Sequence, residues 1–232
     1  MAIRIMEAGF RSFGYKRIGL AVSPDLINWE KHPGNPIIVS DPRFYEEFDQ
    51  SIWHEEAWRD PWVFQHPVTG IWHVFLTARI NHGPMDGRGY IAHGRSEDLI
   101  NREVLRPVAA QGDFSQMEVP QLVSIGGNDY LLFPVSGDVL SKNYRERSGK
   151  DFVAGTHYMV SENPLGPYQY QSDGFLVGDV PGSYYSGKIA RNPVGELVFL
   201  AYHHYAKNSN YLGELGDPIP VIIGDSSGLK LN

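Results

Sequence analysis

Apolar residues in this chain occur in short runs rather than at helical spacing. The runs are rich in Val, Ile, Phe, Tyr and Trp, and Gly, Pro, Asn or Asp bounds them. Such runs are typical of β-strands. We therefore predict an all-β fold, with strands at residues 17–23, 61–66, 71–79, 89–96, 120–126, 129–137, 156–162, 186–192, 196–205 and 218–225.

Explicit turn sequences join some of these runs in pairs. The segments HPVTG (66–70), IGGND (125–129) and NPVGE (192–196) each separate two runs at the distance of a β-hairpin. The charged segment SKNYRERSGKD (141–151) shows no strand pattern. We expect this segment to be a solvated excursion from the sheets.

A sequence repeat indicates how the hairpins are organised. AVSPDLINWE (21–30) recurs as HGRSEDLINRE (93–103), and MVSENPLGPY (159–168) is a weaker third copy. Each copy follows a predicted strand, and an interval of roughly 60–75 residues is close to that of propeller blades. We therefore predict a β-propeller in which the repeated Ser-x-Asp-Leu element is a structural turn.

Only part of a propeller ring is recognisable. Three hairpin units and the leading fragment KRIGLAVSPDLINW (16–29) make about three and a half blades, whereas closed propellers usually have four to eight. We expect residues 1–232 to form a single β-propeller domain, incomplete at its N-terminus, with residues 1–15 as an irregular segment. Because unpaired edges and uncovered blade faces favour association, we also expect either a homodimer formed through these faces or closure into a smaller irregular ring.

Composition narrows the classes of function. The net charge of −7 argues against a nucleic-acid partner, and the chain has no cysteine for disulfides or thiolate metal sites. The first residues lack the apolar core of a signal peptide, and no apolar run approaches the roughly 18 residues of a membrane span. We expect a cytoplasmic protein without metal or cofactor, with no membrane partner and a neutral ligand.

Two acidic residues lie at the starts of successive hairpins. Asp60 is part of WRDPWVF (58–64) and Glu118 is part of FSQMEVPQL (114–122), at places that we predict to be equivalent. The inner strands of propeller blades line a central channel, so we expect both carboxylates in one pocket. Paired carboxylates are the usual equipment of glycoside hydrolysis. The apolar neighbours of Glu118 would suit it to proton transfer.

These segments also resemble motifs of the five-bladed β-propeller glycosidases of families 32, 43 and 68. WRDPWVF is similar to their Arg-Asp-Pro motif, and MEVPQLV (117–123) to their Glu-Cys-Pro segment, with Val119 where cysteine is usual. IGLAVSPDLINWEKHPGNPII (18–38) and ELGDPIPVIIGDSSGLKL (214–231) resemble other segments of family 32, whose bacterial β-fructosidases are nearest in pattern.

The resemblance implies a glycoside hydrolase that acts on furanosides, with fructosyl or arabinofuranosyl linkages. It implies that Asp60 stabilises the transition state, supported by Arg59, and that Glu118 is the general acid/base. The family's nucleophile, an early aspartate in a Trp-x-Asn-Asp-Pro-like segment, has no match in this sequence. An alternative is therefore a carbohydrate-binding propeller with impaired catalysis. A protein-binding scaffold is less favoured, because carboxylates open two inner strands.

Several further residues are candidates for substrate binding beside Arg59. Trp58 and Trp62 offer rings on which a sugar could stack. Tyr185 opens the third hairpin, and His82 lies in a Gly-rich loop (81–90) that we expect over the channel mouth. The run Tyr202–Tyr205 fits either sugar binding or packing at the rim.

Overall fold

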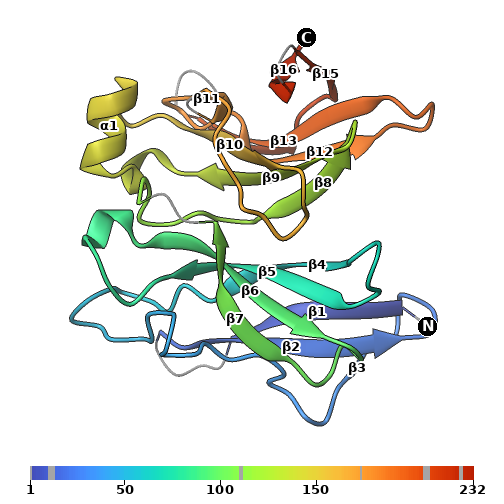
Figure 1. The fold of residues 1–232 in the computed structure, drawn as a ribbon. Coiled ribbons are helices and arrows are strands. Elements are labelled where there is room, and N and C mark those ends of the chain that lie inside the picture. Colours follow the sequence, from blue (N-terminus) through green and yellow to red (C-terminus); the bar gives the residue numbers. More distant parts are fainter. Residues whose placement is uncertain (1, 10–13, 110–111, 173, 206–209, 225–226) are drawn as a thin grey trace.

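Antiparallel β-strands dominate the computed structural model, which describes residues 2–9, 14–109, 112–172, 174–205, 210–224 and 227–232 (Figure 1). The strands are β1 (Ala2–Gly9), β2 (Lys16–Ser23), β3 (Glu30–Lys31), β4 (Arg59–Gln65), β5 (Trp72–Arg79), β6 (Gly89–Ser96), β7 (Glu103–Ala109), β8 (Gln121–Ile125), β9 (Asn128–Val135), β10 (Ala154–Ser161), β11 (Phe175–Asp179), β12 (Tyr185–Arg191), β13 (Leu197–Tyr205), β14 (Tyr211–Leu215), β15 (Ile219–Ile223) and β16 (Leu229–Leu231).

The described strands form four sheets that follow one another along the chain. Two sheets have the order β4-β5-β6-β7 and β11-β10-β9-β8, and a third has the order β12-β13-β15-β16 with β14 also paired to β13. The first sheet contains only β1, β2 and β3. Up-and-down sheets of four strands are the blades of a propeller. The predicted all-β propeller with about three and a half recognisable blades is confirmed.

The predicted turns and the repeat have the expected structural roles. The three turn segments join β4 to β5, β8 to β9 and β12 to β13. In the repeat, Asp25 accepts hydrogen bonds from the N–H groups of residues 27 and 28, at 2.9 and 2.8 Å. Asp98 accepts the same bonds from residues 100 and 101, at 2.9 and 2.7 Å. Leu26 and Leu99 both have φ of 66°, so the two copies share one turn conformation.

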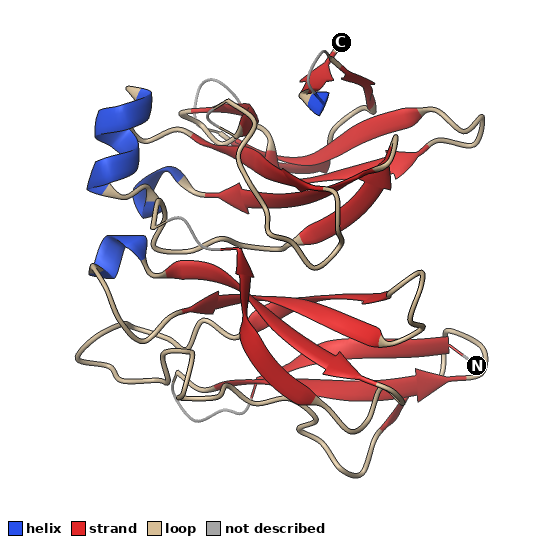
Figure 2. Cartoon of the chain, in the orientation of Figure 1, coloured by secondary structure: helices blue, strands red, loops and turns tan. Residues whose placement is uncertain are grey.

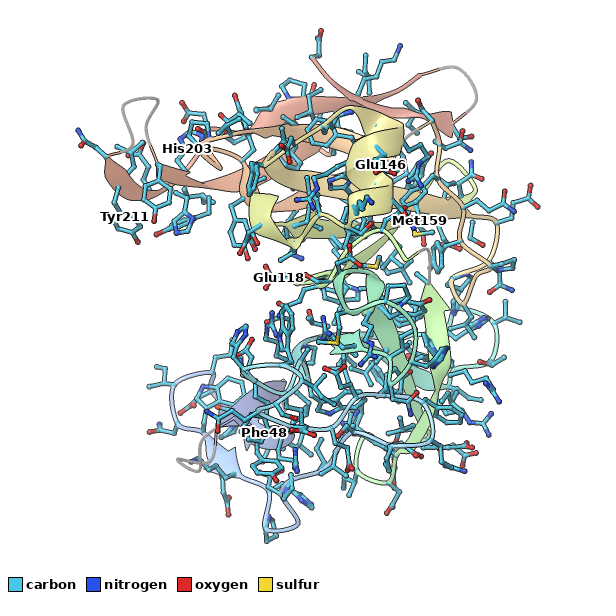
Figure 3. The ribbon with its side chains drawn as sticks, turned by 90° about the vertical axis from the view of Figure 1, so that its left-hand side faces the viewer. Phe48, Glu118, Glu146, Met159, His203 and Tyr211 are labelled. Atoms are coloured by element: carbon cyan, nitrogen blue, oxygen red, sulfur yellow. The ribbon has the colours of Figure 1, made fainter. Side chains whose placement is uncertain are left out.

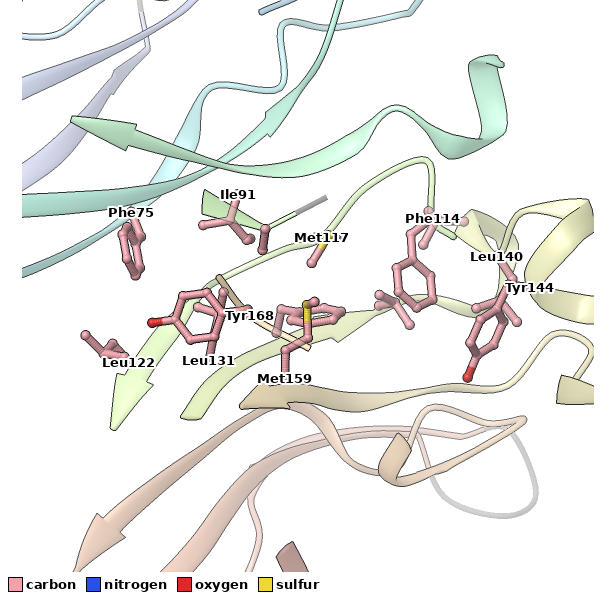
Figure 4. Packing of buried hydrophobic residues seen from close by; sticks show 14 residues of the cluster. Phe75, Ile91, Phe114, Met117, Leu122, Leu131, Leu140, Tyr144, Met159 and Tyr168 are labelled. Carbon is pink, nitrogen blue, oxygen red and sulfur yellow. The ribbon is translucent and has the colours of Figure 1, made fainter. Parts of the chain in front are cut away.

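Hydrophobic cores lie between successive sheets, so the β4–β7 and β8–β11 sheets are covered on both faces. Along β9, Leu131 and Phe133 belong to the core shared with the β4–β7 sheet, whereas Tyr130 and Leu132 face the core of the β12–β16 sheet. Figure 4 shows the first of these cores, with Phe75 packed opposite the strands of the next blade. Strand residues alternate between two faces, which explains the nearly continuous apolar runs in the sequence.

One sequence-based expectation was wrong and a second was incomplete. Residues 2–9 form β1, paired along its whole length with β2, instead of an irregular segment. Within the charged segment 141–151, residues Lys142–Ser148 form helix α1. The Ser141 hydroxyl accepts the N–H of Tyr144 at the helix start, and the buried Tyr144 ring joins the core between two blades. The buried Tyr144 ring and the Ser141 N-cap therefore hold a helix that the charged sequence did not indicate.

The short helices mark one end of the blades. α1 lies there with the 3₁₀ helices η1 (Met85–Gly87) and η2 (Gly137–Val139), as Figure 2 shows. Loops 80–88 and 136–153, which carry these helices, join the ends of β5 and β9 to the next strands. Since β4 and β8 are antiparallel to β5 and β9, the inner strands begin at this same end.

Candidate active site

The inner strands β4, β8 and β12 begin with the same backbone conformation. Asp60, Val119 and Ser186 have φ of 57°, 39° and 55°. Non-glycine residues rarely adopt such values, and a β-branched residue such as Val119 is a clear outlier. Backbone strain of this kind is concentrated at functional sites. The starts of the three inner strands are therefore the first place to look for function.

The strand register corrects one sequence-based equivalence. Arg59 lies opposite Thr77, and Tyr185 lies opposite Tyr202, each just before a β-bulge. Glu118 donates its backbone N–H to Pro134 at 3.1 Å, at the corresponding place of the next blade. Glu118 is thus equivalent to Arg59 and Tyr185, and the residue equivalent to Asp60 is Val119.

Glu118 is held between the two neighbouring blades. Arg59 Nη2 donates to Glu118 Oε1 at 2.5 Å, and the Tyr185 hydroxyl donates to Glu118 Oε2. The Glu118 side chain is 14% exposed. Figure 3, a view onto the end that carries the helices, shows Glu118 near the centre, between the sheets. Polar groups, rather than the expected apolar ones, therefore surround the carboxylate of Glu118.

Asp60 is tied to the segment that carries Glu118. Asp60 Oδ2 accepts a hydrogen bond from Thr77 Oγ1 at 2.8 Å and one from the Val119 N–H at 3.2 Å. Among the described residues, none donates a hydrogen bond to Asp60 Oδ1. The Asp60 side chain is 22% exposed. The structure thus connects the two acids through Arg59 and the Val119 N–H and leaves one oxygen of Asp60 available to a ligand.

Arg59 connects these acids electrostatically. Its Nε lies 3.5 Å from Asp60 Oδ2, its Nη1 lies 3.2 Å from Glu55 Oε1, and its Nη2 also donates to Gln116. Burial opposes the guanidinium charge, but Glu118 and Asp60 outweigh it and raise the pKa of Arg59. Arg59 therefore remains a cation that compensates the charge of several carboxylates in a nearly buried position.

Tyr185 remains a hydrogen-bond donor. Burial is the main cause that raises the pKa of the Tyr185 hydroxyl, and the negative charge of Glu118 raises it further. A protonated hydroxyl can donate to an ionised Glu118. Arg59 and Tyr185 together stabilise the Glu118 carboxylate from both sides.

A second layer of side chains supports this site from below. Trp62, Gln121 and Lys188 occupy equivalent positions, three residues after Arg59, Glu118 and Tyr185. Lys188 Nζ donates to the carbonyl of Val119 and, at 3.4 Å, to that of Pro120. It also lies 5.9 Å from the Trp62 ring centroid. Burial lowers the pKa of Lys188 to about 8, although Asp60 opposes this shift.

The structure places the predicted substrate-binding residues in different surroundings. Arg59 and Tyr185 contact Glu118 directly, and Trp62 is half-buried beside Lys188. The assignment of Trp58 was wrong, because its side chain is only 1% exposed and packs in the core against Tyr45. Its indole precedes Arg59 on the extended chain and points to the opposite face.

His82 lies apart from these contacts. It is exposed in loop 80–88, and its Nδ1 is 3.1 Å from Asn81 Oδ1. The loop is at the same end of the blades as Glu118. No contact between His82 and the two acids is found in the described part of the chain.

Several residues of the site carried no motif. Thr77 and Gln116 are ordinary strand and loop residues in the sequence, and Glu55 is one acid of a charged stretch. Lys188 could have been found by placing Arg59-Asp60-Pro61, Glu118-Val119-Pro120 and residues 185–187 in one register.

Other classes of site are not indicated by the described residues. They contain no group of three or more His, Cys, Asp or Glu side chains that could hold a metal ion. None of their helices is both long and apolar enough to span a membrane.

Comparisons with known proteins support the fold. No protein-family model and no curated protein matches the sequence. Among solved structures, an inulosucrase from Halalkalicoccus jeotgali bound to kestose has a TM-score of 0.76 at 17% identity, over 97% of this chain and 64% of that one. Levansucrase from Bacillus subtilis has a TM-score of 0.77 at 13% identity, over 99% and 64%.

A third similar structure is the catalytic domain of a β-fructofuranosidase from Microbacterium saccharophilum K-1. Its TM-score is 0.72 at 16% identity, over 99% of this chain and 59% of that one. The chain thus spans less than two thirds of the length of these proteins. Together with the four successive sheets, these likenesses show that the chain has the β-propeller fold of inulosucrases, levansucrases and β-fructofuranosidases.

Proposed function

We propose that the chain carries the acid/base half of a glycoside hydrolase site that acts on fructosyl linkages. The observation that carries this proposal is the cluster Arg59–Glu118–Tyr185, formed by equivalent residues of three blades, with Asp60 bonded to the N–H of Val119, the residue after Glu118. A partly exposed pair of carboxylates at the end of the blades suits reaction at a glycosidic bond. The fold shared with three fructosyl enzymes supports the choice of a fructoside.

In this proposal Glu118 is the general acid/base. In its protonated form it donates a proton to the glycosidic oxygen as the bond to the anomeric carbon breaks, and the water molecule that then adds to this carbon returns a proton to Glu118. The carboxylate formed between the two transfers is stabilised by Arg59 and Tyr185, which already contact both of its oxygens. Because the protein stabilises the carboxylate that proton transfer produces, it also lowers the free energy of the transition state that leads to this carboxylate.

Asp60 holds the sugar in this proposal. Its Oδ2 is engaged by Thr77 and Val119, so the orientation of the carboxylate is fixed. Its Oδ1 then accepts hydrogen bonds from hydroxyl groups of the sugar, and its charge stabilises the oxocarbenium-like transition state. No residue of this chain is assigned to the nucleophile.

Replacement of Glu118 by Gln tests the proposal. Glu118→Gln keeps the shape and removes the transferable proton, so the rate of sucrose hydrolysis should fall by about 10²–10⁴-fold. The midpoint of thermal unfolding should fall, because the variant loses the nearly buried ion pair with Arg59, so hydrolysis is measured well below the midpoint of the variant, where both chains are folded. Equal hydrolysis rates for the parent chain and the variant would contradict the assignment. Sucrose binding by the parent without any turnover would instead favour the carbohydrate-binding alternative.

A further inference from the structure

Aromatic side chains form a continuous row that begins at Glu118. The Tyr185 ring stacks on His204 with centroids 5.6 Å apart and planes at 24°. His204 in turn contacts Tyr202, Tyr205 and Tyr211, at 5.5, 4.5 and 5.8 Å. The hydroxyls of Tyr202 and Tyr211 are hydrogen-bonded to each other. We call these five side chains the aromatic row.

The outer part of the aromatic row is open to solvent. Tyr211 is 63% exposed and Tyr205 is 37% exposed, whereas Tyr185 at the inner end contacts Glu118. In Figure 3, Tyr211 lies at the outer edge of the last sheet and Glu118 lies near the centre. The row therefore leads from the candidate active site outward over the rim.

These rings are not needed for the core of the blade. Strand β13 is buried at Val198, Phe199 and Ala201, where it packs in the core between the last two sheets. Beyond residue 201 it pairs with β14, and every residue of β14 is exposed. The end of β13 beyond residue 201 and the whole of β14 thus extend past the packed part of the blade, where Tyr205 and Tyr211 are exposed and Tyr202 and His204 are half-buried.

We propose that the aromatic row is an additional sugar-binding subsite, which takes the second and third units of a neutral oligosaccharide whose terminal unit lies at Glu118. This inference rests on the proposed function, since Glu118 defines the inner end of the chain of sugars. An oligosaccharide is the expected ligand because the row is continuous with the site. The two successive ring contacts, from Tyr185 to His204 and from His204 to Tyr211, together extend beyond the width of one sugar ring.

The chemistry of the row suits a carbohydrate. Tyr combines a flat apolar ring with a hydroxyl, so it can pack against the C–H face of a sugar and hydrogen-bond its hydroxyl groups. It has few rotatable bonds and therefore loses little conformational entropy when a ligand binds. The contact between the hydroxyls of Tyr202 and Tyr211 orders the two rings before a ligand arrives.

Binding of a disaccharide and a tetrasaccharide would test the subsite. Titrations of sucrose and of an inulin-type tetrasaccharide by calorimetry, in the Glu118→Gln chain so that neither is consumed, give both dissociation constants. The tetrasaccharide should bind about tenfold more tightly than sucrose, equivalent to about 1.4 kcal/mol. Tyr211 lies at the outer end of the row, where the third unit would bind, and sucrose has no third unit. Addition of Tyr211→Ala should therefore abolish this advantage and leave the dissociation constant of sucrose unchanged.

Two matched variants make the result specific. Leu212→Ala removes an exposed side chain, 45% accessible, from the other face of the same strand and should retain the advantage of the tetrasaccharide. Tyr211→Phe keeps the ring and should retain most of it. The subsite is overturned if the tetrasaccharide binds no better than sucrose, if Leu212→Ala loses as much as Tyr211→Ala, or if neither sugar binds.

The outcome is separable from that of the proposed reaction. If the parent chain hydrolyses no fructoside but the tetrasaccharide still depends on Tyr211, the subsite stands and the proposed hydrolysis fails. If sucrose is hydrolysed and Tyr211→Ala has no effect on tetrasaccharide binding, the hydrolysis stands and the subsite fails.

Discussion

Two regions of this propeller repeat from blade to blade, but they repeat in different ways. The turns after β2 and β6 share both sequence and structure, with Asp25 and Asp98 bonded to the backbone of their own turns. The starts of β4, β8 and β12 share a backbone conformation, whereas the side chains at their first two positions, Arg-Asp, Glu-Val and Tyr-Ser, all differ. A turn that serves only its own backbone has the same chemical requirement in every blade.

At the strand starts, pairing with the next strand fixes the backbone and leaves the side chains free to differ. The different side chains then meet one another across the blades, as Arg59, Glu118 and Tyr185 do. The contrast indicates where function is to be found in a repeated fold: at positions of equal backbone and unequal side chain. Four substitutions would sharpen or break this contrast.

The largest effect is expected from Asp60→Asn at a strand start, compared with the same substitution in a repeated turn. Asp60→Asn keeps the shape and the positive φ, which Asn tolerates, but removes the charge beside Glu118. Sucrose hydrolysis should fall by about 10²–10³-fold. Asp98→Asn, the matched control in a repeated turn, should leave the rate unchanged. Equal rates for the two variants would remove the functional distinction between the regions.

Lys188→Met tests the charge buried below the site. Burial lowers the pKa of Lys188 from 10.5 to about 8. Between pH 8 and pH 10.5, the unfolded chain therefore holds a proton at Lys188 that the folded chain lacks. The contribution of Lys188 to the free energy of unfolding therefore rises with pH through this window. Relative to Lys188→Met, the parent should gain up to about 3 kcal/mol from pH 7 to above 10.5. Urea unfolding of both chains at several pH values would measure this gain. If the free energies of unfolding of the two chains changed with pH in parallel, the expectation would be contradicted.

Tyr185→Phe should have a smaller effect, because the ring and its stacking on His204 remain. The variant loses the hydrogen bond to Glu118, and we expect about a tenfold fall in kcat for sucrose, in line with about 1–1.5 kcal/mol for such a bond. Tyr130→Phe is a control, since its hydroxyl bonds the Ser227 carbonyl at 3.0 Å. If the control lowers kcat equally, the loss reflects general stability instead of the site.

The smallest effect is expected from Asp98→Ala in the repeated turn. Backbone and side-chain hydrogen bonds lower the pKa of Asp98 in the folded chain. Its contribution to stability is therefore present above the ordinary pKa of about 4 and is lost as the pH falls through and below that value. The unfolding midpoint of the variant should lie a few degrees below that of the parent at pH 7, with a smaller difference near pH 3. A difference independent of pH would contradict this account.

Much of the candidate site could be predicted from local sequence. Arg59, Asp60 and Glu118 stand out because charged residues open otherwise apolar strands. Trp58 was misassigned because the sequence pattern does not reveal which face of a strand start the core takes. Thr77, Gln116 and Glu55 carry no local motif, since each reaches the site from a different loop or strand.

The sequence by itself determined ten of the sixteen described strands, the hairpin turns, the repeated Asp25 and Asp98 turns and the propeller, because these depend on alternation and on bonds within a few residues. It did not indicate the short or outer strands β3, β7, β11, β14 and β16. Only the tertiary structure decided that Glu118 corresponds to Arg59 and Tyr185, that Lys188 supports Val119 from another blade, and that α1 and β1 form. Each of these depends on contacts between residues far apart in the chain, and the register that creates such contacts is set by the packing of whole blades.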